Sequence, residues 1–151
     1  MPEKKTLKRA RKDAREGKSK STQAGEFVRE EIHHIRAGKH GARSTKQAIA
    51  IGLSKARRSG VALEPGGSAS AGTKKRARRD EAVGQGRRAR RATPKRRRAS
   101  KKALERQGRS AASTRSLSRQ GKQAARRRTH AERSRAAKRA ARTRQRAAKK
   151  K

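Results

Sequence analysis

The stretch GKHGARSTKQAIAIGLSKARRSG, residues 38–60, places helix start and stop signals around a group of apolar residues. Ser44 and Gln47 form an S-x-x-Q capping box, in which the hydroxyl accepts from the Gln47 amide and the Gln side chain reaches back. Gly60 is suited to end the helix in a left-handed conformation. The letters AIAIG also suit a strand, but the signals on both sides favour a helix from about Thr45 to Ser59.

A second helix is predicted before this stretch. Ser21 or Thr22 is a suitable N-cap, and Gly38 ends the helix after about Ala37. Its apolar residues follow helical spacing along one arc. We therefore predict a helical hairpin over residues 21–63. Its predicted core comes from both helices and consists of Phe27, Val28, Ile32, Ile35, Ile49, Leu53 and Ala56.

Three residues of this hairpin require a neighbour. Glu31 lies inside the apolar arc, so it needs a basic partner across the hairpin or a dimer interface, and the candidates are Lys46, Lys55 and Arg57. Gly52 allows the other helix to approach closely. Ile51 points away from the shared face, so one partner helix does not cover it. Val61, Leu63 or a second copy of the chain is expected there, and a homodimer through residues 21–63 is one candidate.

The rest of the chain has few residues that can form a core. Leu, Ile, Val, Phe and Met total 14 of 151 residues, nine of them between Phe27 and Leu63, and Cys, Trp and Tyr are absent. A highly charged chain with less than roughly 20% Leu, Ile, Val and Phe is expected to be disordered. Residues 1–20 are a basic segment that can form a short helix, residues 64–73 a Gly/Ser linker, and residues 74–151 a low-complexity basic tail.

The predicted fold class is therefore mostly α. It consists of a small helical-hairpin head and a long basic tail that is disordered when free and becomes helical against a polyanion. The tail is rich in Ala, which favours helix but buries little surface.

Charge identifies the predicted partner. The chain has 50 Lys and Arg against 11 Asp and Glu, a net charge of +39, and residues 65–151 hold 33 basic and 4 acidic residues. Lys and Arg neutralise phosphates and release counterions, which gives strong, salt-dependent binding with little base recognition. The predicted phosphate contacts are Lys74, Lys75, Arg76, Arg78, Arg79, Arg87, Arg88, Arg90, Arg91, Lys95, Arg96, Arg97, Arg98, Lys101, Lys102, Arg126, Arg127, Arg128, Arg133, Arg135, Lys138, Arg139, Arg142 and Arg144.

Enzyme, metal and cofactor sites are not predicted. The Glu30–His33 and Glu31–His34 pairs have the E-x-x-H spacing of di-iron bundles, but such sites need more carboxylates from other helices than this chain offers. The histidines are therefore expected on a solvated helix surface. Residues 84–89 match G-x-G-x-x-A, but no strand precedes them, and no P-loop is present. Catalytic residues, cofactors and a small-molecule substrate are accordingly not expected.

The expected location is the cytoplasm, in association with the nucleoid. The N-terminus lacks the apolar region of a signal peptide, and no apolar run approaches the ~20 residues that span a bilayer, so no membrane contact is expected. In a eukaryote the basic runs would serve as nuclear localisation signals.

The stretches MPEKKTLKRARKDAREGKS and EFVREEIHHIRAGKHGARSTKQAIAIGLSKARRSGV resemble a family of small basic bacterial proteins usually titled DNA-binding or plasmid-stabilisation proteins. The resemblance covers about residues 1–63 and implies DNA association without catalytic residues. The tail is similar to histone-like proteins in composition only. Together, charge and resemblance lead us to expect non-sequence-specific, histone-like DNA binding and compaction, with an RNA- or ribosome-associated role as the alternative.

Overall fold

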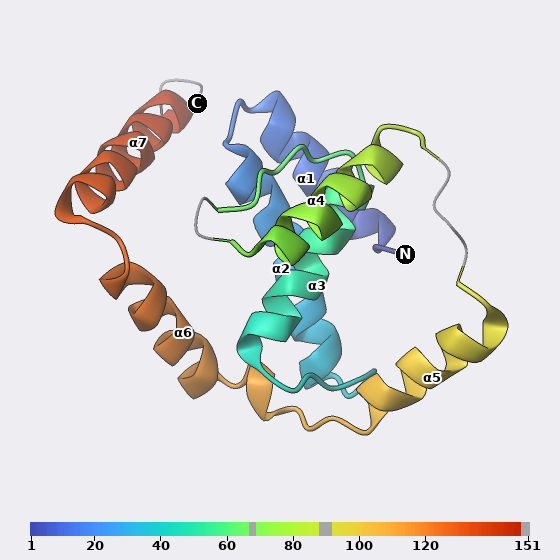
Figure 1. Cartoon of the computed structure of the whole chain (residues 1–151). Coiled ribbons are helices and arrows are strands. Elements are labelled where there is room, and N and C mark those ends of the chain that lie inside the picture. Colours follow the sequence, from blue (N-terminus) through green and yellow to red (C-terminus); the bar gives the residue numbers. More distant parts are fainter. Residues whose placement is uncertain (67–68, 88–91, 149–151) are drawn as a thin grey trace. The chain divides into compact units, whose positions relative to one another are not determined.

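The computed structural model describes residues 1–66, 69–87 and 92–148, and every regular element in these ranges is a helix (Figure 1). The order is α1 (Lys4–Arg15), α2 (Lys20–Arg36), α3 (Thr45–Arg58), α4 (Ala71–Gly84), α5 (Pro94–Glu105), the 3-10 turn η1 (Ser110–Ala112), α6 (Thr114–Arg126) and α7 (His130–Ala148). The prediction of a mostly α protein is confirmed. The chain forms two compact units, Met1–Ser113 and Thr114–Lys151.

The caps predicted for α3 are present. The Ser44 hydroxyl accepts from the Gln47 amide at 3.2 Å, and Gln47 Oε1 accepts in turn from the Arg43 amide at 2.8 Å. At the other end Gly60 has φ +91°, and the Val61 amide donates to a carbonyl of the last turn. A start signal, a stop signal and apolar spacing agree here, which is why the sequence locates α3 well.

α2 begins earlier than the sequence predicts. Its N-cap is Ser19, not Ser21 or Thr22: the Ser19 hydroxyl accepts from the Thr22 amide at 3.2 Å. Three hydroxyl residues lie within four positions, and each is a good N-cap, so local chemistry does not choose among them. The end of α2 agrees with the prediction, because Gly38 follows it with φ +76°.

α2 and α3 approach each other closely at Gly52. A Cβ atom there would lie 2.7 Å from the Cα atom of Val28, so a larger residue would push the helices apart. This confirms the role predicted for the glycine. Among the predicted core residues, the structure buries Phe27, Ile32, Ile35 and Ala56 and leaves Val28, Ile49 and Leu53 half-buried.

α1 packs against α2 and belongs to the same core. Ala10 is buried in the cluster around Phe27, and Leu7 packs against that cluster. Beyond α1, Lys18 Nζ lies 2.7 Å from Asp13 Oδ1, and the hydrogen bonds from this ammonium to Asp13 and Glu16 raise the pKa of Lys18. The basic N-terminal segment is therefore part of the folded head.

The predicted linker and the start of the predicted tail form a helix on α3. α4 begins at Ala71, and its N-cap Ser70 accepts from the Thr73 amide at 3.3 Å. Ile51 is half-buried and lines an open groove of about 1180 Å³ that is shared with Ala77 of α4. α4 of the same chain therefore lies beside the face of α3 that carries Ile51, where a second copy of the chain is one of the predicted partners.

Small and polar residues form the contact between α4 and α3. Ala77 is 3% exposed, and the Ser54 hydroxyl donates to Asp80 Oδ2 at 2.6 Å. Gly84 lies so close to the Arg57 carbonyl that a Cβ atom would overlap it. Val83 is the one large apolar residue of α4 and is half-buried in the same groove, so a pattern search based on Leu, Ile, Val and Phe finds no apolar face on this helix.

A later part of the predicted tail holds the turn between α2 and α3. The Gly41 amide donates to the Leu104 carbonyl at 2.9 Å, and a Cβ atom on Gly41 would overlap the Gln107 carbonyl. The Thr45 hydroxyl donates to the Ala111 carbonyl at 2.7 Å. These contacts are mainly with backbone atoms, so composition does not reveal them.

The unit Thr114–Lys151 contains α6 and α7. None of its described residues is buried, and Leu117 on α6 is half-buried. The disorder predicted for the free tail is not confirmed, since these segments are helical in the structure. Among the described helices, none is long and apolar enough to cross a membrane.

Candidate nucleic-acid interface

α4 presents four basic residues on the side opposite α3. Lys74, Lys75, Arg78 and Arg79 follow the spacing of one helical face, whereas Ala77 is buried on the other side. We call these four residues the α4 basic face. None of the ion pairs between described residues involves them. Their charges are therefore available to an external anion.

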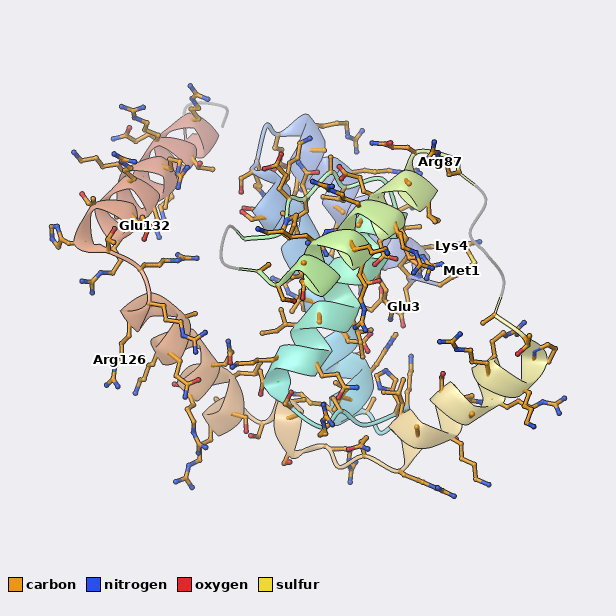
Figure 2. The ribbon with its side chains drawn as sticks, in the orientation of Figure 1. Met1, Glu3, Lys4, Arg87, Arg126 and Glu132 are labelled. Atoms are coloured by element: carbon orange, nitrogen blue, oxygen red, sulfur yellow. The ribbon has the colours of Figure 1, made fainter. Side chains whose placement is uncertain are left out.

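The α4 basic face lines a shallow hollow of about 590 Å³. Arg87 extends this lining just beyond the helix, and Figure 2 shows it at that end of α4. Among the described residues, the other side chains that line the hollow belong to Ala71 and Ala82. Small alanines between long cationic side chains leave room for a phosphate group to approach the helix surface. Arg76, by contrast, lines the groove between α3 and α4 and does not belong to this face.

α5 places the next predicted contacts on an exposed helix. Thr93 caps it by accepting from the Arg96 amide at 3.4 Å, and Pro94 occupies its first turn. One of its cations forms an ion pair, since Lys101 Nζ lies 3.5 Å from Glu105 Oε1. All predicted contacts on this helix are exposed, namely Lys95, Arg96, Arg97, Arg98, Lys101 and Lys102.

The second unit carries its predicted contacts at the end of α6 and around α7. Figure 2 labels Arg126 at the end of α6 and Glu132 near the start of α7. Hydrogen bonds from the Thr129 amide and hydroxyl hold the pKa of Glu132 below its ordinary value. The predicted contacts here are all exposed and comprise Arg126, Arg127, Arg128, Arg133, Arg135, Lys138, Arg139, Arg142 and Arg144. Arg88, Arg90 and Arg91 lie outside the described residues.

Acidic residues and histidines gather instead on the α2 side of the head. Glu31 is 1% exposed, and Lys55 Nζ lies 2.6 Å from its Oε2 atom, so Lys55 is the partner among the three predicted candidates. Burial would raise the pKa of the neighbouring Glu30, but hydrogen bonds from Thr6 and the Glu3 amide, together with the Lys55 charge, lower it.

The histidines do not all lie on a solvated surface. His33 is exposed, but His34 is buried and its Nε2 atom lies 2.8 Å from Glu3 Oε1. His40 Nε2 lies 3.1 Å from Glu31 Oε1. Sequence reasoning missed the participation of Glu3 and His40 because both lie outside α2 and reach it only through the tertiary fold.

The G-x-G-x-x-A letters begin at Gly84, the last residue of α4, so they follow a helix and not the strand that a dinucleotide site requires.

Comparison with known proteins gives no further assignment: no family model matches this sequence, and no curated protein or solved structure is significantly similar to it.

Proposed function

We propose that this protein binds the phosphate backbone of double-stranded DNA without sequence specificity and compacts it. The observation that carries the proposal is the α4 basic face, whose four cations lack acidic partners among the described residues. Because the opposite side of α4 packs on α3, the head holds these charges on a folded surface. The exposed cations of α5, α6 and α7 add further positive charge to the chain.

The aromatic content favours duplex over single-stranded nucleic acid. Proteins that bind single strands stack bases on exposed aromatic side chains. Phe27 is the only Phe, and Trp and Tyr are absent. Since Phe27 is 1% exposed, it is not available for stacking. The resemblance of residues 1–63 to proteins titled DNA-binding supports DNA as the partner. The proposed location is the nucleoid.

The test is fluorescence anisotropy of a labelled duplex with the full chain over a series of salt concentrations. Each phosphate neutralised contributes about 0.9 to the slope of log affinity against log salt. Replacing Lys74, Lys75, Arg78 and Arg79 by Ala should lower that slope by about 3 to 4. The matched control replaces Lys4, Lys5, Lys8 and Arg15, four exposed cations of α1, by Ala and should lower the slope less.

Two outcomes would contradict the proposal. A full chain that does not bind duplex DNA at physiological salt would exclude it. Ribosomal RNA that displaces the duplex at equal nucleotide concentration would favour the RNA-associated alternative. Equal slopes for the two four-residue variants would remove the special role of the α4 basic face while leaving general phosphate binding intact.

The order of the tail is a separate part of the proposal. We propose that α6 and α7 are weakly helical in the free chain and gain helix on DNA, because phosphates relieve repulsion between neighbouring Arg side chains. Circular dichroism of a peptide spanning residues 114–151 should show a clear gain of helix at saturating duplex. An unchanged spectrum would contradict coupled folding without affecting the assignment of the α4 basic face.

A further inference from the structure

Acidic residues and histidines converge at one point of this basic protein. Glu3, Glu30 and Glu31 are three of only 11 acidic residues, and His34 and His40 are two of only four histidines. They come from the N-terminus, α2 and the turn before α3, and the ion pairs Glu3–His34 and Glu31–His40 connect these segments. This cluster is independent of the proposed DNA contacts.

Three of these residues have the arrangement of metal ligands. One ligand atom each from Glu31, His34 and His40 lies within 4.8 Å of the other two. Their side chains are 1%, 11% and 19% exposed, so the site is largely shielded from water. The 3.1 Å from His40 Nε2 to Glu31 Oε1 is close to the distance of about 3.3 Å that separates two ligands of a tetrahedral zinc ion.

The hydrogen bond on the other side of the His40 ring determines how Nε2 faces Glu31. His40 Nδ1 lies 3.1 Å from the Gly41 carbonyl oxygen, which can only accept, so Nδ1 carries the proton. In a neutral ring Nε2 is then an acceptor, and it faces Glu31 Oε1, a second acceptor. Two acceptors at this distance in a shielded site require a cation between them, either a proton or a metal ion.

The surrounding residues fit the supporting groups of a metal site. Metal-binding histidines usually hydrogen-bond a backbone carbonyl or a carboxylate through the other ring nitrogen, as His40 does with the Gly41 carbonyl. Glu31 Oε2 is held by Lys55 Nζ, which lies 2.6 Å from it. Lys55 also lies 3.4 Å from Glu30 Oε1, so its charge is shared between two carboxylates. Because Lys55 contacts the Oε2 atom of Glu31, the Oε1 atom can face a metal ion.

We propose that Glu31, His34 and His40 bind one divalent transition-metal ion of the zinc class. Two imidazoles and one carboxylate are a common ligand set for this class of ion. The ion would join α2 to the turn that leads into α3, and its binding would therefore stabilise the hairpin. The E-x-x-H spacing of Glu31 and His34 supplies two ligands on one helix, and the third comes from the turn.

The test uses the full chain after treatment with a chelator, without nucleic acid. Isothermal titration calorimetry with Zn²⁺ should give one ion per chain, and thermal denaturation should show a higher unfolding temperature with Zn²⁺ than without it. Co²⁺ should give the visible absorption of a four- or five-coordinate site. Loss of a supporting group alone costs about 10- to 100-fold in affinity, so His34→Gln and His40→Gln should each cost at least about 100-fold.

The other two histidines provide matched controls. His33 and His130 are exposed, and His33→Gln and His130→Gln should leave the affinity unchanged. Gln at position 40 keeps an amide donor toward Glu31, which favours a folded variant. If a variant nevertheless unfolds, nitrogen NMR of the wild-type histidine rings decides, because Zn²⁺ should shift only the His34 and His40 signals.

Three results would overturn the proposal. The first is no Zn²⁺ uptake by the full chain, with the His40 ring carrying both protons, which would show that a proton occupies the position between His40 and Glu31. The second is binding that survives His34→Gln and His40→Gln. The third is an equal loss of affinity on His33→Gln, which would indicate adventitious surface binding.

Discussion

The hairpin of α2 and α3 and the unit that contains α6 and α7 are both helical, but they differ in what stabilises the helices. Phe27 and Ile35 are 1% and 0% exposed between packed helices, whereas no described residue after Ser113 is buried. The hairpin helices gain stability from burial of apolar surface. α6 and α7 have only helix propensity and caps, which are weak in isolation. Although both regions are helical, we therefore expect the hairpin to unfold cooperatively and α6 and α7 to unfold gradually.

The largest expected effect comes from removing the main core side chain. Phe27→Ala should lower the free energy of unfolding of the first unit by about 4 kcal/mol, which approaches the whole stability of a domain at the lower end of the usual range of about 5 to 15 kcal/mol. Circular dichroism during heating should show loss of the cooperative transition. Leu117→Ala on α6 is the control and should leave that transition unchanged. A cooperative transition that survives Phe27→Ala would show that the hairpin core is not the stabilising element.

Separating the buried ion pair should have the next largest effect. Lys55→Met removes the ammonium that lies 2.6 Å from the buried Glu31 carboxylate, and breaking a buried pair costs about 3 kcal/mol or more. Chemical denaturation of the full chain measures the change. Lys46→Met on the exposed side of the same helix is the matched control, and its effect should be within about 0.5 kcal/mol of zero. Equal effects of the two variants would mean that Glu31 does not depend on Lys55.

Ile51→Lys distinguishes the two ways of covering the second side of α3. Ile51 lines the groove shared with α4, so the variant should lower the free energy of unfolding by about 1 to 2 kcal/mol. Its sedimentation coefficient should equal that of the wild type. A fall in sedimentation coefficient without loss of stability would instead support the homodimer through residues 21–63.

The smallest expected effect is in α7, where Thr129 and Glu132 form a capping box. The Glu132 amide donates to the Thr129 hydroxyl at 3.2 Å, and Glu132 Oε2 accepts from the Thr129 amide at 2.8 Å. Since the bonds that Glu132 Oε2 accepts from the Thr129 amide and hydroxyl lower the pKa of Glu132, their stabilisation is present above its ordinary value of 4.5 and is lost as the pH falls through the lowered value.

Carbon chemical shifts of residues 130–135 in the full chain, followed against pH, measure this loss of helix. Glu132→Gln should make the first turn of α7 independent of pH in this range. A wild-type titration identical to that of Glu132→Gln would contradict a role for the capping box.

The elements that can be predicted from the sequence are those whose signals are local. The capping box at Ser44, the left-handed Gly60 and the apolar spacing of residues 45–59 all act within a few positions, so they predict α3 correctly. The role of Gly52 can also be predicted, because a glycine on the apolar face of a helix indicates the close approach of a neighbouring helix. The excess of Lys and Arg predicts a polyanionic partner without any knowledge of the fold.

Contacts between residues that are far apart in the sequence depend on how the helices pack. Three basic residues were candidates for Glu31, and the packing of α3 on α2 selects Lys55. The sequence does not predict α4 as a packed helix, because α4 contacts α3 through Ala77, Asp80 and Gly84, which do not form an apolar core pattern. Likewise, the sequence places His40 in a turn, and only the reversal of the chain brings it to Glu31. The physical reason is that spacing along one helix defines a face, whereas the residue that meets this face depends on how separate helices pack.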